Sequence, residues 1–190
     1  MAARCRLLGH PSGRHLLMTV RLHRGFTLIE LLVAVTIAVV LLVMAMPGYV
    51  AWVSDSEIRN AAQSIANGLR TAQSTAVSSN ANVQFVLTPT DWTVATVDAP
   101  LVILKTASLK EGSRNSTIVG INAASTAATT VAFDPLGRVI NNAANLVQVD
   151  VTLPSIAGTR PLRVLVGNGR TGVKMCDPAW AWPDPKGCPP

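Results

Sequence analysis

The chain has 190 residues, of which 49% are hydrophobic and only 14% are charged, which predicts one modest globular domain together with a membrane segment. The net charge is +6, but five of the sixteen basic residues precede Gly25 and the rest of the chain is nearly neutral. The positive charge therefore indicates a targeting segment at the N-terminus and not an acidic binding partner. All three histidines also precede Gly25, so a chain that is cut there has no histidine for Ser-His-Asp or Cys-His catalysis. The spacing of the remaining polar residues suggests no other enzyme, metal site or cofactor.

The first predicted element is an apolar segment from Phe26 to Met46, interrupted only by two threonines and Glu30. As a helix, its 21 residues reach about 30 Å, which is enough to span a bilayer core. Arginines precede this segment and carboxylates follow it. The positive-inside rule therefore places its N-terminus in the cytoplasm and the remainder of the chain across the membrane.

Three interpretations of this segment compete. A secretory signal peptide fits the basic start and the apolar run, with Val43-Met44-Ala45 as an acceptable cleavage site, and a simple single-span anchor fits as well. Neither explains Glu30, because an ionised side chain at the centre of a membrane helix costs about 3 kcal/mol and normally has a partner. The third interpretation comes from the residues around Glu30.

The string Arg24-Gly25-Phe26-Thr27-Leu28-Ile29-Glu30 resembles the class III signal of type IV pilins and type II secretion pseudopilins. The resemblance implies that a prepilin peptidase cuts between Gly25 and Phe26 on the cytoplasmic face and methylates the new amine of Phe26. It also implies that the Glu30 carboxylate pairs with the Phe26 ammonium of a neighbouring subunit in a filament. Residues 1–25 are then a leader, which shortens to an ordinary eight residues if translation starts at Met18.

After the apolar segment, residues 47–81 are predicted to continue as an amphipathic helix. Pro47-Gly48 marks either the end of the first helix or, as in the pilin family, a bend or melted stretch within one long helix. Beyond it, from about Ser54 to Ser79, apolar residues recur at steps of three and four, which is the pattern of one helix face. This stripe consists of Ile58, Ala62, Ile65, Leu69, Ala72 and Ala76.

Residues 82–190 are predicted to form a β-rich domain, because short β-branched runs alternate with turn residues. A helix followed only by strands predicts an α+β fold, with antiparallel sheet packed on the amphipathic half of a long, pilin-like N-terminal helix whose first half is transmembrane. The predicted strands are Val83–Leu87, Trp92–Val97, Leu101–Lys105, Thr117–Ile121, Thr130–Phe133, Leu146–Leu153, Leu162–Val166 and Gly172–Met175.

The residues where the helix meets the sheet resemble one group within the pilin family. Residues Ile65–Val77 and the turn Phe133–Gly137 are similar to the GspH/FimT group of minor pilins, except that Gln73 and Thr75 stand where that group often has Arg and Glu. The resemblance implies a non-enzymatic subunit that primes or caps a type IV pilus or a type II secretion pseudopilus. It further implies a bacterial inner-membrane anchor with a periplasmic domain, and as partners other major and minor pilin subunits, the prepilin peptidase, the inner-membrane assembly platform and membrane lipid.

Cys176 and Cys188 are the only cysteines after the leader, and translocation places them in an oxidising periplasm. We therefore expect a disulfide that closes the proline- and tryptophan-rich C-terminal loop. On the chain-entropy model such a bond stabilises the fold by roughly 3 kcal/mol. Free thiols or a metal site are the alternative.

A basic segment precedes this loop and contains no acidic residue between positions 160 and 174. Its cations are Arg160, Arg163, Arg170 and Lys174. Cations neutralise phosphates and the nearby Trp180 and Trp182 offer faces for base stacking, so DNA is an alternative partner. FimT proteins are associated with DNA uptake in natural transformation through a basic C-terminal motif, which Gly169-Arg170 and Lys174 resemble with a different spacing. The competing interpretation is a solvated sheet face with tryptophans over its edge.

Overall fold

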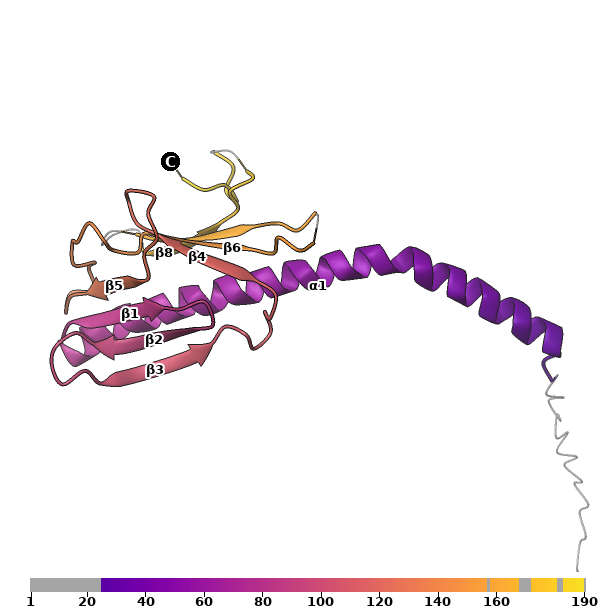
Figure 1. Cartoon of the computed structure of the whole chain (residues 1–190), viewed down its shortest axis with the longest axis horizontal. Helices are drawn as coiled ribbons and strands as arrows, with labels where there is room; N and C mark the ends of the chain where they lie inside the picture. Colours follow the sequence, from indigo (N-terminus) through magenta and orange to yellow (C-terminus); the bar gives the residue numbers. More distant parts are fainter. Residues whose placement is uncertain (1–24, 157, 168–171, 181–182, 190) are drawn as a thin grey trace, which may run out of the picture. The chain divides into compact units, whose positions relative to one another are not determined.

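The computed structural model describes residues 25–156, 158–167, 172–180 and 183–189. The chain divides into two compact units, the first ending at Val43 and the second starting at Met44. In the described part of the chain, a single helix of 52 residues enters both units, and eight strands follow it in the second unit (Figure 1). The elements are α1 (Leu28–Ser79), β1 (Val83–Leu87), β2 (Asp91–Thr96), β3 (Ile103–Ser108), β4 (Thr117–Ile121), β5 (Thr130–Phe133), β6 (Gln148–Thr152), β7 (Leu162–Val166) and β8 (Val173–Cys176).

The helix α1 begins at residues that cap it. The backbone N–H of Glu30 donates to Oγ1 of Thr27 over 3.3 Å, and the N–H of Leu31 donates to the Thr27 carbonyl over 3.1 Å. A threonine followed three residues later by a glutamate is the pattern of a capping box, which satisfies N–H groups that have no partner within the first helical turn. Thr27 and Glu30 therefore start the helix where the apolar segment begins.

The helix continues through Pro47 and Gly48. The expectation of one long helix is confirmed, and the alternatives of a helix end or a melted stretch at this dipeptide are wrong, while a bend there stays a prediction. Proline lacks a backbone N–H, so the helix loses one hydrogen bond at Pro47. The turns before and after it remain helical because helix propagation is cooperative.

From Ser54 onward one face of α1 is buried against the strands. The predicted stripe is confirmed, since Ile58, Ala62, Ile65, Leu69, Ala72 and Ala76 are all 0% exposed. These side chains form one hydrophobic core with inward-facing residues of both sheets. The helix approaches the sheet closely at Gly68, where a Cβ would lie 2.8 Å from the rings of both Phe85 and Trp92. Trp92 also ties the sheet to the helix, because its Nε1 donates to Ser64 Oγ over 3.0 Å.

The strands form two antiparallel sheets of four strands each within the described residues. The strand order is β3-β2-β1-β5 in the first sheet and β4-β6-β7-β8 in the second. In the first sheet Phe85 lies opposite Val94 on one side and Val131 on the other. In the second, Val149 lies opposite Val164. The predicted α+β class, a long helix packed on antiparallel sheet, is confirmed (Figure 1).

The observed strands agree with the predicted ones to within three residues at each end. The largest difference is at β3, which ends at Ser108 instead of Lys105 and begins at Ile103 instead of Leu101. The N–H of Val102 donates to Thr96 Oγ1 over 2.9 Å, so Leu101 and Val102 belong to the connection between β2 and β3. A side-chain hydrogen bond of this kind competes with the ladder and shortens the strand.

The turn after β5 is organised by Asp134. Its Oδ1 accepts the backbone N–H groups of Leu136 and Arg138 over 2.9 and 2.8 Å. The backbone N–H of Arg138 is the largest cause that lowers the pKa of Asp134 below its usual 3.8. Because the folded pKa is lowered, the carboxylate stabilises the turn at neutral pH, and this contribution is lost as the pH falls through the lowered pKa. Gly137 then takes φ +72°, and Gln73 Nε2 donates to its carbonyl over 2.7 Å.

Replacing Gly120 with alanine is expected to lower the free energy of unfolding by about 2 kcal/mol. A Cβ on Gly120 would overlap the carbonyl oxygen of Ala128 and lie 2.6 Å from Leu146 Cδ1. The N–H of Ala128 donates to the Gly120 carbonyl over 2.9 Å, so the two backbones are held at this separation. Urea unfolding of the detergent-solubilised chain, followed by tryptophan fluorescence, measures the change. Val119→Ala is the matched control, because Val119 is 46% exposed on the same strand. Equal losses in both variants would contradict the packing argument.

Candidate functional site

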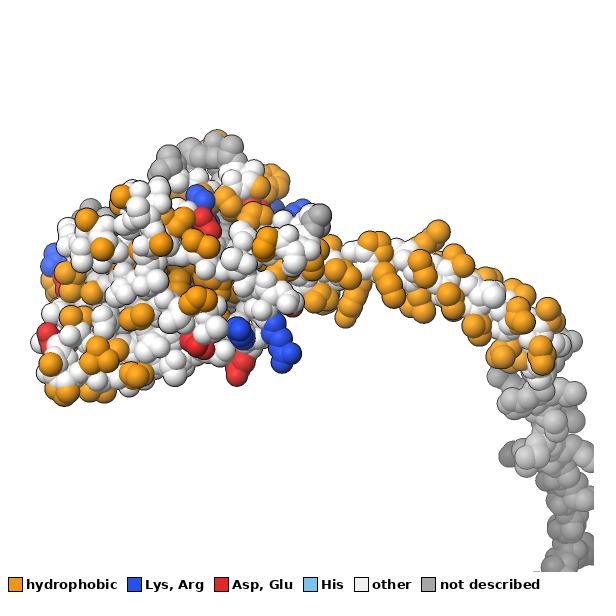
Figure 2. Space-filling model, viewed as in Figure 1, with side chains coloured by type: hydrophobic (Ala, Val, Ile, Leu, Met, Phe, Trp, Pro, Cys, Tyr) orange, Lys and Arg blue, Asp and Glu red, His pale blue; other side chains and the backbone are white. Residues whose placement is uncertain are grey.

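The N-terminal part of α1 is apolar on all sides and exposed. From Leu28 to Met46 every large apolar side chain is at least 48% exposed, as the hydrophobic side chains along the free helix in Figure 2 show. Among the described residues, α1 is the one helix that is long and apolar enough to cross a membrane, by length and composition. A helix that is apolar all round requires an apolar environment, which lipid or other helices provide.

The residues predicted for processing and assembly lie at the start of this helix. Gly25 has open space around it and Phe26 is 81% exposed, so the peptide bond between them is accessible. Glu30 lies one helical turn further on and is exposed. Within the described residues its carboxylate has no ion-pair partner. A carboxylate in apolar surroundings requires a partner, so Glu30 is available to a cation from another molecule.

Two aromatic side chains follow the apolar segment on α1. Tyr49 and Trp52 are 66% and 67% exposed, and their ring centroids are 6.3 Å apart. Exposed tyrosine and tryptophan at the end of an apolar span are typical of the membrane–water interface, where the ring is apolar and its N–H or O–H remains hydrated. The aromatic pair therefore marks one boundary of the apolar span.

The C-terminal loop is closed by a disulfide between Cys176 and Cys188, as expected from the sequence. The S–S distance is 1.99 Å and the two residues are 12 positions apart. Next to the bond, the N–H of Asp177 donates to the Lys186 carbonyl over 2.8 Å. The disulfide leaves neither sulfur as a free thiol or a metal ligand, so it replaces the alternative interpretation of these cysteines.

The structure describes three of the four cations of the basic segment. Arg163 is paired with Asp150 on the neighbouring strand, with Nε 2.7 Å from Oδ1, so a carboxylate from outside the segment neutralises it. Arg160 lies before β7, and its backbone N–H donates to Asp55 Oδ1 of α1 over 3.0 Å. Lys174 lies on β8, where it pairs with Leu165 of β7. Arg170 and Trp182 lie outside the described residues.

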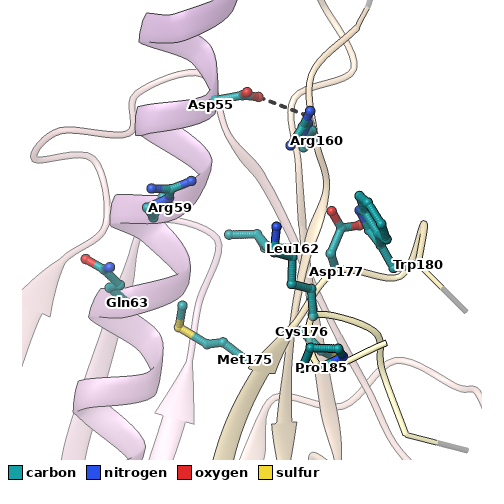
Figure 3. A pocket seen from close by; sticks show the side chains of 11 residues that line it. Asp55, Arg59, Gln63, Arg160, Leu162, Met175, Cys176, Asp177, Trp180 and Pro185 are labelled. Atoms are coloured by element: carbon teal, nitrogen blue, oxygen red, sulfur yellow. Dashed lines mark hydrogen bonds between the residues drawn. The ribbon is translucent and has the colours of Figure 1, made fainter. Parts of the chain in front are cut away.

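Arg160 instead belongs to a cleft between α1 and the C-terminal loop, which we call the C-terminal cleft (Figure 3). Its volume is about 500 Å³. Helix α1 contributes Asp55, Arg59 and Gln63 to one wall. The opposite wall comes from the approach to β7, from β8 and from the disulfide loop, and it consists of Arg160, Leu162, Met175, Cys176, Asp177, Trp180, Pro185 and Lys186.

Two cleft cations, Arg59 and Lys186, were missed by sequence reasoning. Arg59 lies outside the apolar stripe of the amphipathic helix, where a solvated side chain is expected, and Lys186 lies in a loop without periodicity. The structure places both beside Arg160, and Lys186 Nζ lies 5.5 Å from the centroid of the Trp180 ring. The sequence carries no signal that places residues 59 and 186 in one cleft, because this depends on how the sheet folds back onto the helix.

Comparisons with known proteins agree with this architecture. The family model described as type II transport protein GspH matches residues 61–170, and the one described as prokaryotic N-terminal methylation motif matches residues 20–46. No curated protein matches the chain.

Two solved structures are similar to the chain. One is the minor pseudopilin EpsH from the type 2 secretion system of Vibrio cholerae, with 14% identity, 65% of this chain and 99% of that chain covered, and a TM-score of 0.49. Another is the type IV minor pilin FimU of Pseudomonas aeruginosa, with 16% identity, 64% and 81% covered, and a TM-score of 0.36. The GspH model alone spans more than half of this chain, and the methylation motif covers the start of its exposed helix. The chain therefore belongs to the family described as type II transport protein GspH.

Proposed function

We propose that the chain is a minor pilin or pseudopilin that primes or caps the assembly of a type IV pilus or a type II secretion pseudopilus. The observation that carries this proposal is the exposed apolar start of α1, which follows the Gly25–Phe26 bond directly and holds Glu30 as its one acidic residue. This surface suits a helix that first lies in lipid and later among other helices. The partners are the major and minor pilins whose helices surround it.

Processing is the first step of the proposed mechanism. A prepilin peptidase cuts between Gly25 and Phe26 on the cytoplasmic face and methylates the new amine of Phe26. The cut removes residues 1–25 with their five arginines, which had held the start of the chain in the cytoplasm. It leaves an ammonium group directly before an apolar helix, five positions from the Glu30 carboxylate counted from the new N-terminus.

Assembly is the second step, and the charges direct it. When the helix moves from lipid into a filament, its apolar surface exchanges one apolar environment for another, so burial supplies little net driving force. An ammonium and a carboxylate in such an environment interact strongly, and each is costly to leave unpaired. The Phe26 ammonium of one subunit and Glu30 of its neighbour therefore set the register between helices.

The proposed topology follows from the same features. The apolar span lies in the bacterial inner membrane, the second unit lies in the periplasm, and Tyr49 and Trp52 lie at the outer interface. An oxidising periplasm agrees with the disulfide between Cys176 and Cys188. In this position the subunit is available to the assembly platform of the inner membrane.

DNA capture through Arg160, Arg163, Arg170 and Lys174 stays a prediction of the sequence. The described residues lend it little support, because Asp150 neutralises Arg163 and Arg160 faces the C-terminal cleft. The comparisons name no DNA-binding protein.

The mature N-terminus tests the proposal. Mass spectrometry of the membrane protein, from a host with a prepilin peptidase, is expected to show a chain that starts at N-methylated Phe26. Gly25→Leu is expected to leave the leader attached, because a bulky side chain would stand at the bond to be cut. Gly48→Leu is the matched control, since Gly48 also has open space around it and lies outside the motif. A start after Ala45, or an uncut Gly25–Phe26 bond, would overturn the pilin interpretation.

A further inference from the structure

Strand β3 forms one edge of the first sheet, and within the described residues it pairs only with β2 (Figure 1). The other edge strands of the two described sheets have partners on their outer sides. Backbone N–H groups of the connections that follow them donate to the carbonyls of Gly120 in β4 and Ala132 in β5, both over 2.9 Å. Arg70 of α1 donates to the Val173 carbonyl of β8 over 3.3 Å. In this part of the chain, β3 is therefore the edge that remains open.

The register of β3 identifies the backbone groups that point outward. The N–H of Leu109, directly after β3, donates to the Thr90 carbonyl over 2.8 Å. Bonded and non-bonded pairs alternate along an antiparallel ladder, and Thr106 lies three positions before Leu109, opposite Thr93. The N–H and C=O of Thr106 therefore point away from β2, where the backbone of a further strand can bond with them.

The approach to this edge and its first residues are apolar. Leu101, Val102, Ile103 and Leu104 follow one another, and each is between 44% and 63% exposed. Hydrophobic side chains gather over this end of the domain, at the lower left of Figure 2. Proteins normally blunt or cover an open edge strand, and a contiguous exposed apolar patch marks an interaction site. The edge thus offers backbone hydrogen bonds and apolar contact together, which is what an added strand requires.

A single charge selects among the strands that could bind. Lys105 is the one charged residue of β3, and it is exposed and forms no ion pair among the described residues. Asp91, the one charged residue of β2, lies opposite Ser108 and accepts a hydrogen bond from Thr90 Oγ1 over 2.6 Å. Opposite charges on neighbouring strands stabilise a sheet, whereas like charges directly opposite destabilise it. The edge therefore favours a strand that carries a carboxylate where it passes Lys105.

The direction of β3 limits the partner further. The connection before β3 lies near the end of α1, because the N–H of Val97 donates to the Asn82 carbonyl over 3.0 Å. The connection after β3 lies near the middle of α1, where the N–H of Asn115 donates to Glu57 Oε2 over 3.4 Å. Strand β3 thus runs along α1 in the opposite direction. Subunits whose helices are parallel have parallel β3 strands, so an antiparallel partner, the more stable kind, is a different strand.

We propose that β3 pairs with an antiparallel edge strand of a different pilin subunit, one that has apolar side chains and a carboxylate opposite Lys105. A second copy of this chain does not fit. Its open edge among the described strands is β3 itself, which would run parallel and bring lysine beside lysine. The inference rests on the proposed function, since a filament brings unlike subunits side by side with their helices parallel.

Photo-cross-linking of the full chain tests the contact, in cells that contain its own set of pilin subunits. A benzophenone amino acid replaces Ile103 in one variant. In the matched control it replaces Leu136, which is 71% exposed on the turn after β5. The Ile103 variant is expected to give a strong cross-link that mass spectrometry maps to a strand of another pilin. A cross-link to a second copy or to a helix, or equal yields from the two variants, would overturn the proposal.

Thr106→Pro separates backbone pairing from side-chain contact. Proline removes the outward N–H and leaves the groups that bond to β2 in place, which edge strands tolerate. Thr106→Ala is the matched control, because it loses the same Oγ1 hydrogen bond to the Trp92 carbonyl but keeps the N–H. Proline is expected to weaken the cross-link from residue 103 by about tenfold, and alanine to leave it unchanged. Equal cross-links from both variants would mean that no strand is added at β3.

Lys105→Glu tests the predicted carboxylate and leaves the backbone intact, so it gives a result even where the proline variant does not fold. It is expected to weaken the cross-link by about fivefold, because it puts like charges together. Lys110→Glu is the matched control, since Lys110 is an exposed cation beyond the end of β3. Equal cross-links from both variants would contradict the charge of the partner, and with it the proposal.

The mature N-terminus is measured on the same preparations, which separates this inference from the proposed function. A chain that starts at Phe26 but gives no cross-link from residue 103 contradicts the added strand alone. A cross-link to a strand of another protein, from a chain that is cut elsewhere, contradicts the proposed function alone.

Discussion

Replacing Glu30 with glutamine is expected to leave the chain processed and anchored in the membrane but to remove it from filaments. The backbone N–H of Glu30 donates to Thr27 Oγ1, and the Glu30 carboxylate has no ion-pair partner in the described chain. Glutamine retains the capping pattern, because Glu and Gln both occur at this position of a capping box, and it removes the charge. Hydrogen bonds to charged groups contribute about 1.5–3 kcal/mol, so incorporation is expected to fall by at least about tenfold.

The fraction of the chain in sheared filaments, relative to that in membranes, measures this loss by immunoblotting. Thr36→Val is the matched control, because Thr36 lies in the same apolar span and its Oγ1 bonds only to the Val33 carbonyl within the helix, over 2.8 Å. The control is expected to assemble like the native chain. If Glu30→Gln also assembles normally while Glu30→Ala does not, the residue acts through the helix cap, and the proposed charge partner is wrong.

Removing the disulfide with Cys176→Ser and Cys188→Ser is expected to lower the free energy of unfolding by about 3 kcal/mol. The bond joins residues 12 positions apart and closes a loop that adds no helix or strand of its own within the described residues. The hydrogen bond from Asp177 to Lys186 lies beside the disulfide and is too weak to close the loop alone. Urea unfolding of the detergent-solubilised chain measures the loss.

Two comparisons make this result specific. Reducing agent is expected to shift the unfolding midpoint of the native chain and to leave that of the double serine variant unchanged. An unchanged unfolding midpoint in both experiments would mean that the loop packs independently of its disulfide.

The elements themselves could be predicted from the sequence because their signals are local. The apolar run from Phe26 predicts the start of α1 to within two residues, and the three- and four-residue steps from Ile58 to Ala76 predict its buried face. Alternation and turn residues predict each strand to within three positions. Two cysteines in one oxidising compartment predict their own pairing.

The order of the strands and the surroundings of the charged residues were decided only by the tertiary structure. No local pattern tells that β5 leaves its sequence neighbours and pairs with β1. Likewise, the segment that carries Arg163 has no carboxylate, and only strand pairing brings Asp150 opposite it. The C-terminal cleft likewise depends on tertiary structure, because it is lined by residues as distant in sequence as Arg59 and Lys186. Propensity and periodicity act over a few residues, whereas these features arise from contacts between distant residues whose sequences do not encode one another's position.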